Sequence, residues 1–368
     1  MKILILSCRT GEGHNSAAKA VKEALDDFGA ECELVDALTF SGRRPNEIVT
    51  NSYNRMIVKA PNMFGLIYKA GDLYSSTKLA SPVYWANSLY AERLRAYIEN
   101  GGFTAVVCSH LFPMETLTWL KRRGEITQKC YGILTDYTCI PFFHETDLDA
   151  YFIPHTEVTE ECLEKGMAGE KLLTTGIPVM KTFSNRVEKQ MAREKLSIPA
   201  GCKLFLIMTG GIGCGRVFDF CDGILAKSGK DVCVIVLSGR NEQLKAGLNS
   251  RYGLDNRVRA VSFTTEVALY MNAADVLLTK PGGISTTEAA VANVPLCHTM
   301  PIPGCETKNA ALFEKKGMSV RANSPQEAVE KALGLMEDNT LRERICKMQR
   351  EQINPNASRD IAAYILNQ

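Results

Sequence analysis

Short apolar runs alternate with stretches of helical periodicity along the whole chain. In the first half, the predicted strands are residues 3–7, 33–35, 105–108, 131–134 and 150–153. The predicted helices between them include residues 15–28 and 114–123. Strands that are apolar on both faces and separated by helices are typical of a parallel sheet covered on both sides. The pattern therefore predicts a doubly wound α/β domain.

The same rhythm returns in the second half. The predicted strands are residues 204–208, 232–237, 258–263, 276–278 and 294–297, and helical periodicity resumes over 325–336 and 341–352. A charged stretch followed by Pro199-Ala200-Gly201 interrupts the rhythm between the halves. We expect an α/β chain of two Rossmann-like domains that face a central cleft. The first domain should span residues 1–178 and the second residues 201–345, joined by a linker over 179–200. Terminal helices are expected over 346–368, and the helix 357–366 should pack back on the first domain.

Composition narrows the class of protein. The 368 residues are 45% hydrophobic and 23% charged, with a formal charge of +2, which describes a globular chain without a bias toward nucleic acid. No run of about 18 apolar residues predicts a membrane span, and residues 1–8 are expected to be a first strand rather than a signal peptide. Thirteen cysteines without a C-x-x-C pair favour reduced thiols inside a cell.

Residues 279–309 carry the strongest chemical pattern. A predicted strand ends at Pro281-Gly282-Gly283 and opens a helix, which presents free backbone N–H groups to an anion. Glu288, one helical turn later, is placed to accept hydrogen bonds from a vicinal diol. Phosphate and ribose together indicate a nucleotide, for which the expected binding residues are Gly282, Gly283, Ile284, Ser285, Thr286 and Glu288.

A second glycine loop follows the first strand of the second half. Gly210, Gly211 and Gly213 let the backbone approach a diphosphate, and the absence of Gly-Lys-Ser/Thr argues against an ATPase P-loop. Two anion loops in one domain strengthen the nucleotide interpretation. The base is expected along Phe263 and Thr264, at the end of the strand 258–263.

His14 lies where the first strand gives way to the first helix. A histidine titrating near neutrality is suited to general-base catalysis, and the helix N-terminus should keep it neutral. Gly13 and Asn15 flank it. A dinucleotide fingerprint with Asp36 is a weak alternative because the third glycine is missing, and a packing or capping role for His14 also stays open.

Polar residues follow two further strands of the first half. Asp136, in Leu-Thr-Asp-Tyr-Thr, is expected to orient His14, bind the acceptor or act as the base, with Tyr137 beside it. His110 is expected to line the same site. Ser109 and His110 are adjacent and no G-x-S-x-G elbow exists, which argues against a serine hydrolase. No grouping has the ligand spacing of a standard metal site, so no metal is expected.

Residues 43–98 interrupt the strand–helix rhythm. Eight Lys and Arg residues outnumber three acidic ones there, interleaved with tyrosines, Trp85 and methionines. Such a mixture is typical of helices lying at an anionic membrane surface. The alternative is an ordinary insertion whose aromatic side chains pack inward.

The motifs resemble those of the diacylglycerol glycosyltransferases of glycosyltransferase family 28, which make monoglycosyl- and processively glycosylated diacylglycerol. The opening loop resembles their Gly-Gly-Gly-His-Asn motif and Thr135-Asp136-Tyr137 resembles their Thr-Asp-Tyr segment. The stretch 303–309 resembles their Pro-Gly-Gln-Glu-x-x-Asn motif, with Cys305 in place of Gln. A more distant resemblance is to the N-acetylglucosamine transferase of the peptidoglycan lipid precursor.

The resemblance implies a GT-B fold and inverting transfer of a hexose from UDP-glucose or UDP-galactose to diacylglycerol or a glycosyl-diacylglycerol. It implies His14 and Asp136 as catalytic residues, an acceptor site with Gly13, Asn15, His110 and Tyr137, and Cys305, Glu306 and Asn309 near the sugar. No cofactor or metal is expected, and the enzyme should lie at the cytoplasmic face of the cell membrane. Alternatives are a UDP-N-acetylglucosamine transferase acting on a polyprenyl-linked acceptor, a UDP-sugar epimerase and a UDP-sugar-binding regulatory protein.

Overall fold

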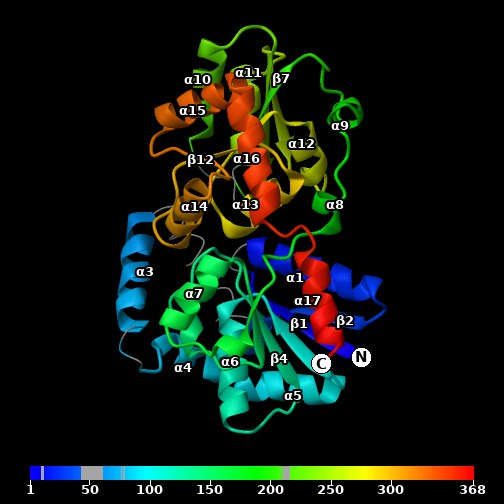
Figure 1. Cartoon of the computed structure of the whole chain (residues 1–368), viewed down its shortest axis with the longest axis vertical. Helices are drawn as coiled ribbons and strands as arrows, with labels where there is room; N and C mark the ends of the chain where they lie inside the picture. Colours follow the sequence, from blue (N-terminus) through cyan, green and yellow to red (C-terminus); the bar gives the residue numbers. More distant parts are fainter. Residues whose placement is uncertain (10–11, 43–60, 76, 78, 209, 211–215) are drawn as a thin grey trace. The chain divides into compact units, whose positions relative to one another are not determined.

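A computed structural model describes the chain except residues 10–11, 43–60, 76, 78, 209 and 211–215 (Figure 1). The chain divides into two compact units. Unit 1 comprises Met1–Lys181, Ile302–Cys305 and Asn354–Gln368, and unit 2 comprises Thr182–Pro301 and Glu306–Ile353. Each unit is built around a parallel six-stranded sheet, so the α/β class with two doubly wound domains is confirmed.

The sheet of unit 1 has the order β2-β1-β3-β4-β5-β6. Its strands are β1 (Lys2–Ser7), β2 (Glu31–Asp36), β3 (Ala105–Cys108), β4 (Lys129–Ile133), β5 (Ala150–Ile153) and β6 (Leu172–Thr174). Leu6 pairs with Cys108, and Cys108 pairs with Gly132, so the carboxyl ends of β1, β3 and β4 reach the same edge of the sheet. The loops after these three strands carry His14, His110 and Asp136.

Helices lie around this sheet in unit 1, and α3 stands apart from the sheet (Figure 1). They are α1 (Glu12–Asp27), α3 (Pro61–Ser75), α4 (Pro82–Ser88), α5 (Ala91–Gly101), α6 (Leu111–Arg122), α7 (Thr156–Glu164) and α17 (Ala357–Leu366), with short 3₁₀ turns at η1 (Ala37–Ser41), η2 (Phe143–Glu145) and η3 (Gly169–Lys171). The apolar face of α17, with Ile361, Ala362 and Ile365, is buried in one cluster with Val21 of α1 and Ile3 of β1. The last helix is therefore part of the core of unit 1.

The sheet of unit 2 has the order β12-β11-β10-β7-β8-β9. Its strands are β7 (Lys203–Met208), β8 (Val232–Gly239), β9 (Val258–Ser262), β10 (Val276–Thr279), β11 (Leu296–His298) and β12 (Val320–Arg321). Thr279 pairs with Met208, so the segments that follow β10 and β7 begin side by side at one sheet edge.

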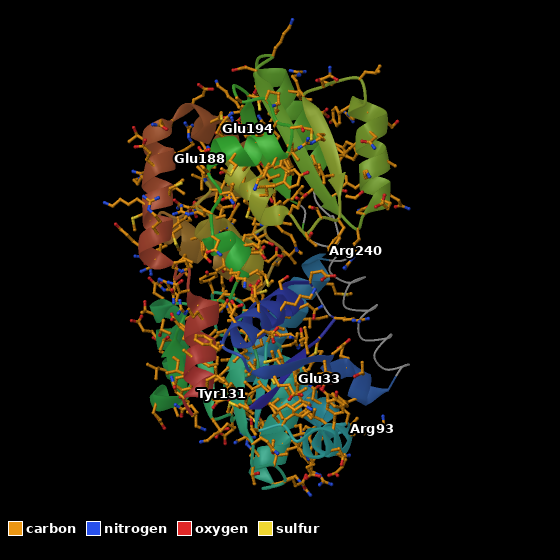
Figure 2. The ribbon with its side chains drawn as sticks, turned by 90° about the vertical axis from the view of Figure 1, so that its right-hand side faces the viewer. Glu33, Arg93, Tyr131, Glu188, Glu194 and Arg240 are labelled. Atoms are coloured by element: carbon orange, nitrogen blue, oxygen red, sulfur yellow. The ribbon has the colours of Figure 1, made fainter. Side chains whose placement is uncertain are left out.

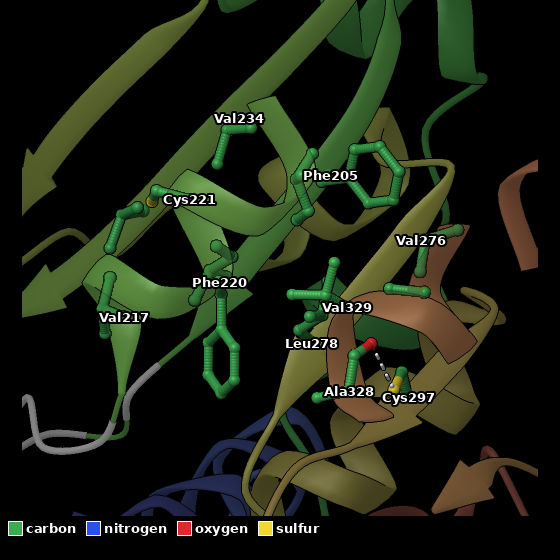
Figure 3. Close-up of a cluster of buried hydrophobic side chains, with 14 of the residues drawn as sticks. Phe205, Val217, Phe220, Cys221, Val234, Val276, Leu278, Cys297, Ala328 and Val329 are labelled. Carbon is green, nitrogen blue, oxygen red and sulfur yellow. Dashed lines mark hydrogen bonds between the residues drawn. The ribbon is translucent and has the colours of Figure 1, made fainter. Parts of the chain in front are cut away.

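The helices of unit 2 are α8 (Lys181–Ser184), α9 (Lys189–Lys195), α10 (Val217–Lys227), α11 (Glu242–Tyr252), α12 (Val267–Ala273), α13 (Gly283–Ala292), α14 (Cys305–Lys315), α15 (Pro325–Glu337) and α16 (Asn339–Gln352). The first residues of α8 and α14, Lys181 and Cys305, are still assigned to unit 1. Figure 3 shows part of the core, where Phe220 of α10 and Val329 of α15 approach Phe205 and Leu278 of the sheet. The buried Cys297 thiol donates to the Ala328 carbonyl at 3.8 Å in the same cluster.

The apolar pattern located ten of the twelve strands of the described chain and missed β6 and β12, which have three and two residues. The segment 179–200 was expected to be a linker. In the structure Thr182 onward is assigned to unit 2, and α9 packs there through Arg193, whose Nε donates to the Ala273 carbonyl at 3.0 Å. Among the helices described, none is both long and apolar enough to cross a membrane.

Candidate functional site

His14 lies in the first turn of α1 and its imidazole is held by the loops after β3 and β4. Its Nδ1 atom is 2.9 Å from the Ser109 carbonyl oxygen and 3.0 Å from the Thr135 hydroxyl oxygen. A carbonyl oxygen only accepts hydrogen bonds, so Nδ1 carries the proton and donates it to this oxygen. The other ring nitrogen, Nε2, then has its lone pair available to accept a proton.

The loops around His14 are tied together by further hydrogen bonds. The Ser109 hydroxyl donates to the His14 carbonyl at 2.9 Å, and the Ser7 hydroxyl donates to the Asn15 side-chain oxygen at 2.7 Å. Burial lowers the pKa of His14 below its usual 6.5, which the hydrogen bond to Ser109 opposes only in part. The imidazole is therefore neutral near pH 7, as a general base must be.

His110 contacts His14 edge to face, with ring centroids 4.5 Å apart. The His110 side chain caps α6, because its Nδ1 accepts the Phe112 N–H at 3.1 Å. Burial and the neighbouring His14 lower the pKa of His110 well below its usual value. The structure therefore brings His110 into the His14 site, where it also caps a helix.

Asp136 and Tyr137 follow Thr135, the residue that contacts His14. Asp136 is partly exposed, whereas Tyr137 is buried in unit 1. The sequence missed Thr135, which touches the imidazole directly. Its position between a strand end and Asp136 is the signal that points to it. Asp36, the acid of the dinucleotide alternative, caps η1 and lies 3.6 Å from the exposed Arg9.

In unit 2, Gly282 precedes the first helical residue of α13 and has no side chain to cap it. Within the described chain, no hydrogen bond engages the backbone N–H groups of Gly283, Ile284 or Ser285, which belong to the first turn of the helix. The Gly282 N–H instead donates to the Lys280 carbonyl at 2.9 Å. The turn is thus a set of open donors at the positive end of a helix dipole, which is a geometry that binds phosphate.

Glu288 follows on the same helix and is partly buried. It forms no hydrogen bond or ion pair with any residue that the structure describes. Burial raises the pKa of its carboxyl from 4.5 to about 8. A carboxyl group kept without a protein partner is suited to bind a ligand that donates hydrogen bonds, such as a diol.

Three of the residues expected to bind the donor have hydrogen-bond or ion-pair partners within the protein. The hydroxyl of the buried Thr286 is 3.1 Å from Nε2 of His298, and the Thr286 N–H donates to the Gly282 carbonyl. The fully buried Asn309 amide donates to the Pro281 carbonyl at 3.0 Å. Glu306, also buried, pairs with Lys280 at 2.9 Å. Asn309 and Glu306 therefore hold the glycine turn from behind.

Lys280 is the residue of this site that the sequence did not single out. Its ammonium group pairs with Glu306, and its chain passes Gly210, where an added Cβ would lie only 3.0 Å from the Lys280 Cε. Gly210 also has φ +72°, which disfavours any side chain. The structure thus brings Gly210 and the 281–283 turn together. Gly211 and Gly213, expected in the same loop, lie outside the described residues, and so does Thr209.

Phe263 and Thr264 follow β9. The Phe263 ring is 54% exposed and the Arg240 guanidinium lies over it, 4.6 Å from the centroid. Figure 2 labels Arg240 in this unit. An exposed aromatic ring with a cation is a platform on which a planar base can stack. Cys305 begins α14 and is partly buried.

No group of three or more His, Cys, Asp or Glu side chains is arranged to hold a metal ion in the described part of the chain. The neighbouring acids Asp147 and Asp149 are both paired with lysines. Lys171 binds Asp147 at 2.6 Å and Lys121 binds Asp149 at 2.7 Å.

Family models match both halves of the chain. The family model of monogalactosyldiacylglycerol (MGDG) synthase matches residues 14–179, and that of the glycosyltransferase family 28 C-terminal domain matches residues 215–363. Two processive diacylglycerol beta-glucosyltransferases, from Bacillus cytotoxicus and Bacillus licheniformis, are 28% and 27% identical to the chain. They align over 92% and 91% of this chain and 86% and 87% of their own length.

Solved structures support the fold. A UDP complex of S. aureus MnaA has a TM-score of 0.66 at 14% identity, covering 100% of this chain and 97% of its own. Acinetobacter baumannii MurG has a TM-score of 0.63 at 15% identity, covering 100% of this chain and 99% of its own. With a family model on each half and relatives along most of its length, the chain is a UDP-sugar glycosyltransferase with a GT-B fold and belongs to the diacylglycerol glycosyltransferases of family 28.

Proposed function

We propose that the protein transfers a hexose from UDP-glucose or UDP-galactose, with inversion, to the hydroxyl group of diacylglycerol or a glycosyl-diacylglycerol. The observation that carries the proposal is the fixed imidazole of His14. The Ser109 carbonyl holds its Nδ1 proton, which leaves Nε2 to take the proton of an acceptor hydroxyl. Inverting transfer requires such a base as the acceptor oxygen attacks the anomeric carbon.

The environment of His14 suits this role. The lowered pKa keeps the imidazole neutral, and Thr135 restrains the ring at 3.0 Å. Asp136, the next residue, is proposed to bind the acceptor hydroxyl or to stabilise the imidazolium that forms. A carboxylate that does either one lowers the barrier by favouring charge in the transition state.

On the donor side, the open N–H groups of Gly283, Ile284 and Ser285 are proposed to bind the diphosphate. Negative charge builds on this group as the sugar leaves, and the positive end of α13 stabilises it there. Glu288 accepts hydrogen bonds from the ribose diol, and Phe263 stacks on the uracil. The proposal includes no metal ion or cofactor.

Contact with an anionic membrane surface, at the cytoplasmic face, is proposed to bring the enzyme to its acceptor. Helix α3 exposes Met63, Leu66, Ile67 and Leu73, with Leu66 and Leu73 exposed by 68% and 74%. An exposed apolar stripe on a helix is what the headgroup boundary accommodates. The sequence also predicted that aromatic side chains of residues 43–98 contact the membrane. For Tyr84 and Tyr90 this prediction is wrong, because both side chains are buried in unit 1.

The membrane proposal is tested by sedimentation with vesicles that contain phosphatidylglycerol. Leu66→Asp together with Leu73→Asp should reduce the bound fraction severalfold, since burial of a leucine contributes about 1.5–3 kcal/mol. Leu254→Asp is the matched control, because Leu254 is a fully exposed leucine of unit 2. If the wild type, the double variant and Leu254→Asp bind the vesicles equally, α3 is not the membrane contact.

The catalytic proposal is tested by supplying radiolabelled UDP-glucose, UDP-galactose or UDP-N-acetylglucosamine with diacylglycerol in anionic vesicles. We expect labelled glycolipid with one of the two hexose donors. Product with UDP-N-acetylglucosamine and a polyprenyl-linked acceptor alone would favour the other transferase. UDP binding without product from any donor would overturn the proposal and favour a regulatory protein.

A further inference from the structure

Unit 2 contains a cavity of about 990 Å³ away from the glycine turn, between α16, the ends of α12 and α13, and the segment before α9. It lies at the C-terminal end of α13, whose first turn holds the open N–H groups. Figure 2 labels Glu188, one of the residues that line it. None of the donor residues discussed above lines this cavity.

The cavity is lined by six cationic side chains and only two acidic ones. The cations are Arg186, Lys189, Arg342, Arg344, Lys347 and Arg350, and the acids are Glu188 and Glu343. The two acids have partners of their own: Glu188 caps α9 and Glu343 accepts from the Asn339 amide at 2.9 Å. Lys189 and Lys347 also have carboxylate partners, Asp275 at 2.9 Å and Glu351 at 3.8 Å, so the positive charge of the lining comes mainly from its four arginines.

Two of the arginines meet at one oxygen atom. Arg186 and Arg350 both donate to the side-chain oxygen of Asn293, at 3.3 and 2.5 Å. Throughout the described chain, no carboxylate pairs with Arg186, Arg350 or Arg344. Both arginines are exposed, so their guanidinium groups lie side by side within reach of an anion from solvent.

The side chain of Asn293, which accepts hydrogen bonds from Arg186 and Arg350, is held in a fixed orientation. Asn293 ends α13 in the left-handed conformation, with φ 62°, and its amide nitrogen donates to the Cys346 carbonyl at 2.7 Å and to the Gln349 side chain at 3.1 Å. Both of these partners belong to α16. The two helices therefore set the oxygen, and with it the arginine pair, before any ligand binds.

The floor of the cavity is largely apolar, with Met271, Ala274, Val294 and Pro295. The buried Asn272 also lines it, and its amide nitrogen has no hydrogen-bond partner in the part of the chain described. A free donor beside an apolar floor suits a ligand body that carries an acceptor group.

We propose that this cavity is a second ligand site, which binds the phosphate group of a small phosphorylated molecule through Arg186, Arg350 and Arg344. Arginine binds phosphate through paired, charge-assisted hydrogen bonds, and two converging guanidinium groups match its oxygens. The volume admits a body of metabolite size on the apolar floor. The site does not depend on the identity of the sugar donor or acceptor.

The test is calorimetric titration of the full-length protein with inorganic pyrophosphate in the presence of saturating UDP, which occupies the donor site. We expect pyrophosphate to bind the wild-type protein even though UDP occupies the donor site. Arg186→Ala with Arg350→Ala should weaken pyrophosphate binding by about tenfold or more, because the variant loses charge-assisted hydrogen bonds to the anion. Lys227→Ala with Arg251→Ala removes the same charge from exposed positions of unit 2 and should leave it unchanged.

Arg344→Ala provides a second variant, because Arg344 is exposed and its loss should not disturb folding. It should weaken pyrophosphate binding by a smaller factor. Absence of binding to the wild type, or equal weakening in the Lys227 and Arg251 control, would overturn the proposal. A parallel arm with phosphatidylglycerol vesicles identifies the source of the phosphate: arginine-dependent binding to vesicles but not to pyrophosphate replaces the small molecule with a lipid headgroup.

Discussion

The Nδ1 atom of His14 lies 2.9 Å from the carbonyl oxygen of Ser109. Because the acceptor is a backbone atom, the orientation of the imidazole and its tautomer are set by the loop after β3 rather than by a neighbouring carboxylate. The stretch of backbone that orients the base also carries His110, so the two histidines share one rigid frame.

Replacement of His14 by Gln should abolish most of the turnover while leaving UDP binding intact. Gln keeps a hydrogen-bonding group but cannot accept a proton at neutral pH, and loss of a general base typically lowers the rate by about 10²- to 10⁴-fold. The measurement is kcat with the labelled donor, beside the Kd for UDP. Lys19→Gln, at an exposed position of α1, is the control. A variant with near-normal kcat would exclude His14 as the base.

The acid limb of the activity profile should lie below pH 6.5. Burial lowers the pKa of His14, so the neutral, active form persists at a pH where an exposed histidine is already half protonated. As the pH falls through the lowered pKa, kcat/KM should fall with it. In Thr135→Val, which lacks the hydroxyl beside Nδ1, kcat should drop severalfold while KM for the donor stays the same. An acid limb above 6.5 would contradict the lowered pKa.

UDP should bind more tightly as the pH rises toward 8. The free carboxyl of Glu288 has a pKa of about 8, and a diol that donates two hydrogen bonds favours the ionised form. Below that pH, binding must release a proton, so Kd should fall by up to about tenfold per pH unit and level off above pH 8. Calorimetry in buffers of different ionisation enthalpy measures the proton. In Glu288→Gln both the release and the pH dependence should vanish.

Glu115 should make the protein less stable in alkali. This fully buried carboxyl has no hydrogen-bond partner for either oxygen among the described residues, and burial, together with Glu145, raises its pKa to about 10 from 4.5. The folded chain therefore holds a proton that the unfolded chain releases. Stability falls as the pH rises between these two values, because the folded state binds the extra proton.

Glu115→Gln removes this dependence, since the amide cannot ionise. The melting temperature of the variant relative to the wild type should increase steadily between about pH 6 and about pH 9. Glu170→Gln, on an exposed turn, should show a constant difference across the same range. Parallel curves for the Glu115 variant and the wild type would show that Glu115 is already ionised in the folded protein.

Much of the fold follows from local pattern, because buried parallel strands must be apolar and helices must repeat every 3.6 residues. Helix α17 begins and ends at the predicted residues, since its apolar face is regular. Strands β6 and β12 are too short to leave a pattern. Their place is decided by pairing with β5 and β11.

The same limit applies to the candidate site. The glycine turn and His14 could be predicted as site residues because glycine and histidine stand just after predicted strands. The pairing of Lys280 with Glu306, and of Asn309 with the Pro281 carbonyl, joins segments separated by 26 and 28 positions. No local pattern encodes such contacts. Thr286 looked available for a ligand beside a glycine turn, but the packing of α13 on His298 turns its hydroxyl inward.

The packing of α17 against α1 has a consequence for how the protein is made. The core of unit 1 contains Ile3 and Ile365, so the residues that close it are synthesised only after all of unit 2. Domains generally fold as units during synthesis. Unit 2 therefore has its complete sequence first, whereas the apolar side chains of α1 that pack against α17, such as Val21, stay uncovered until α17 has been synthesised.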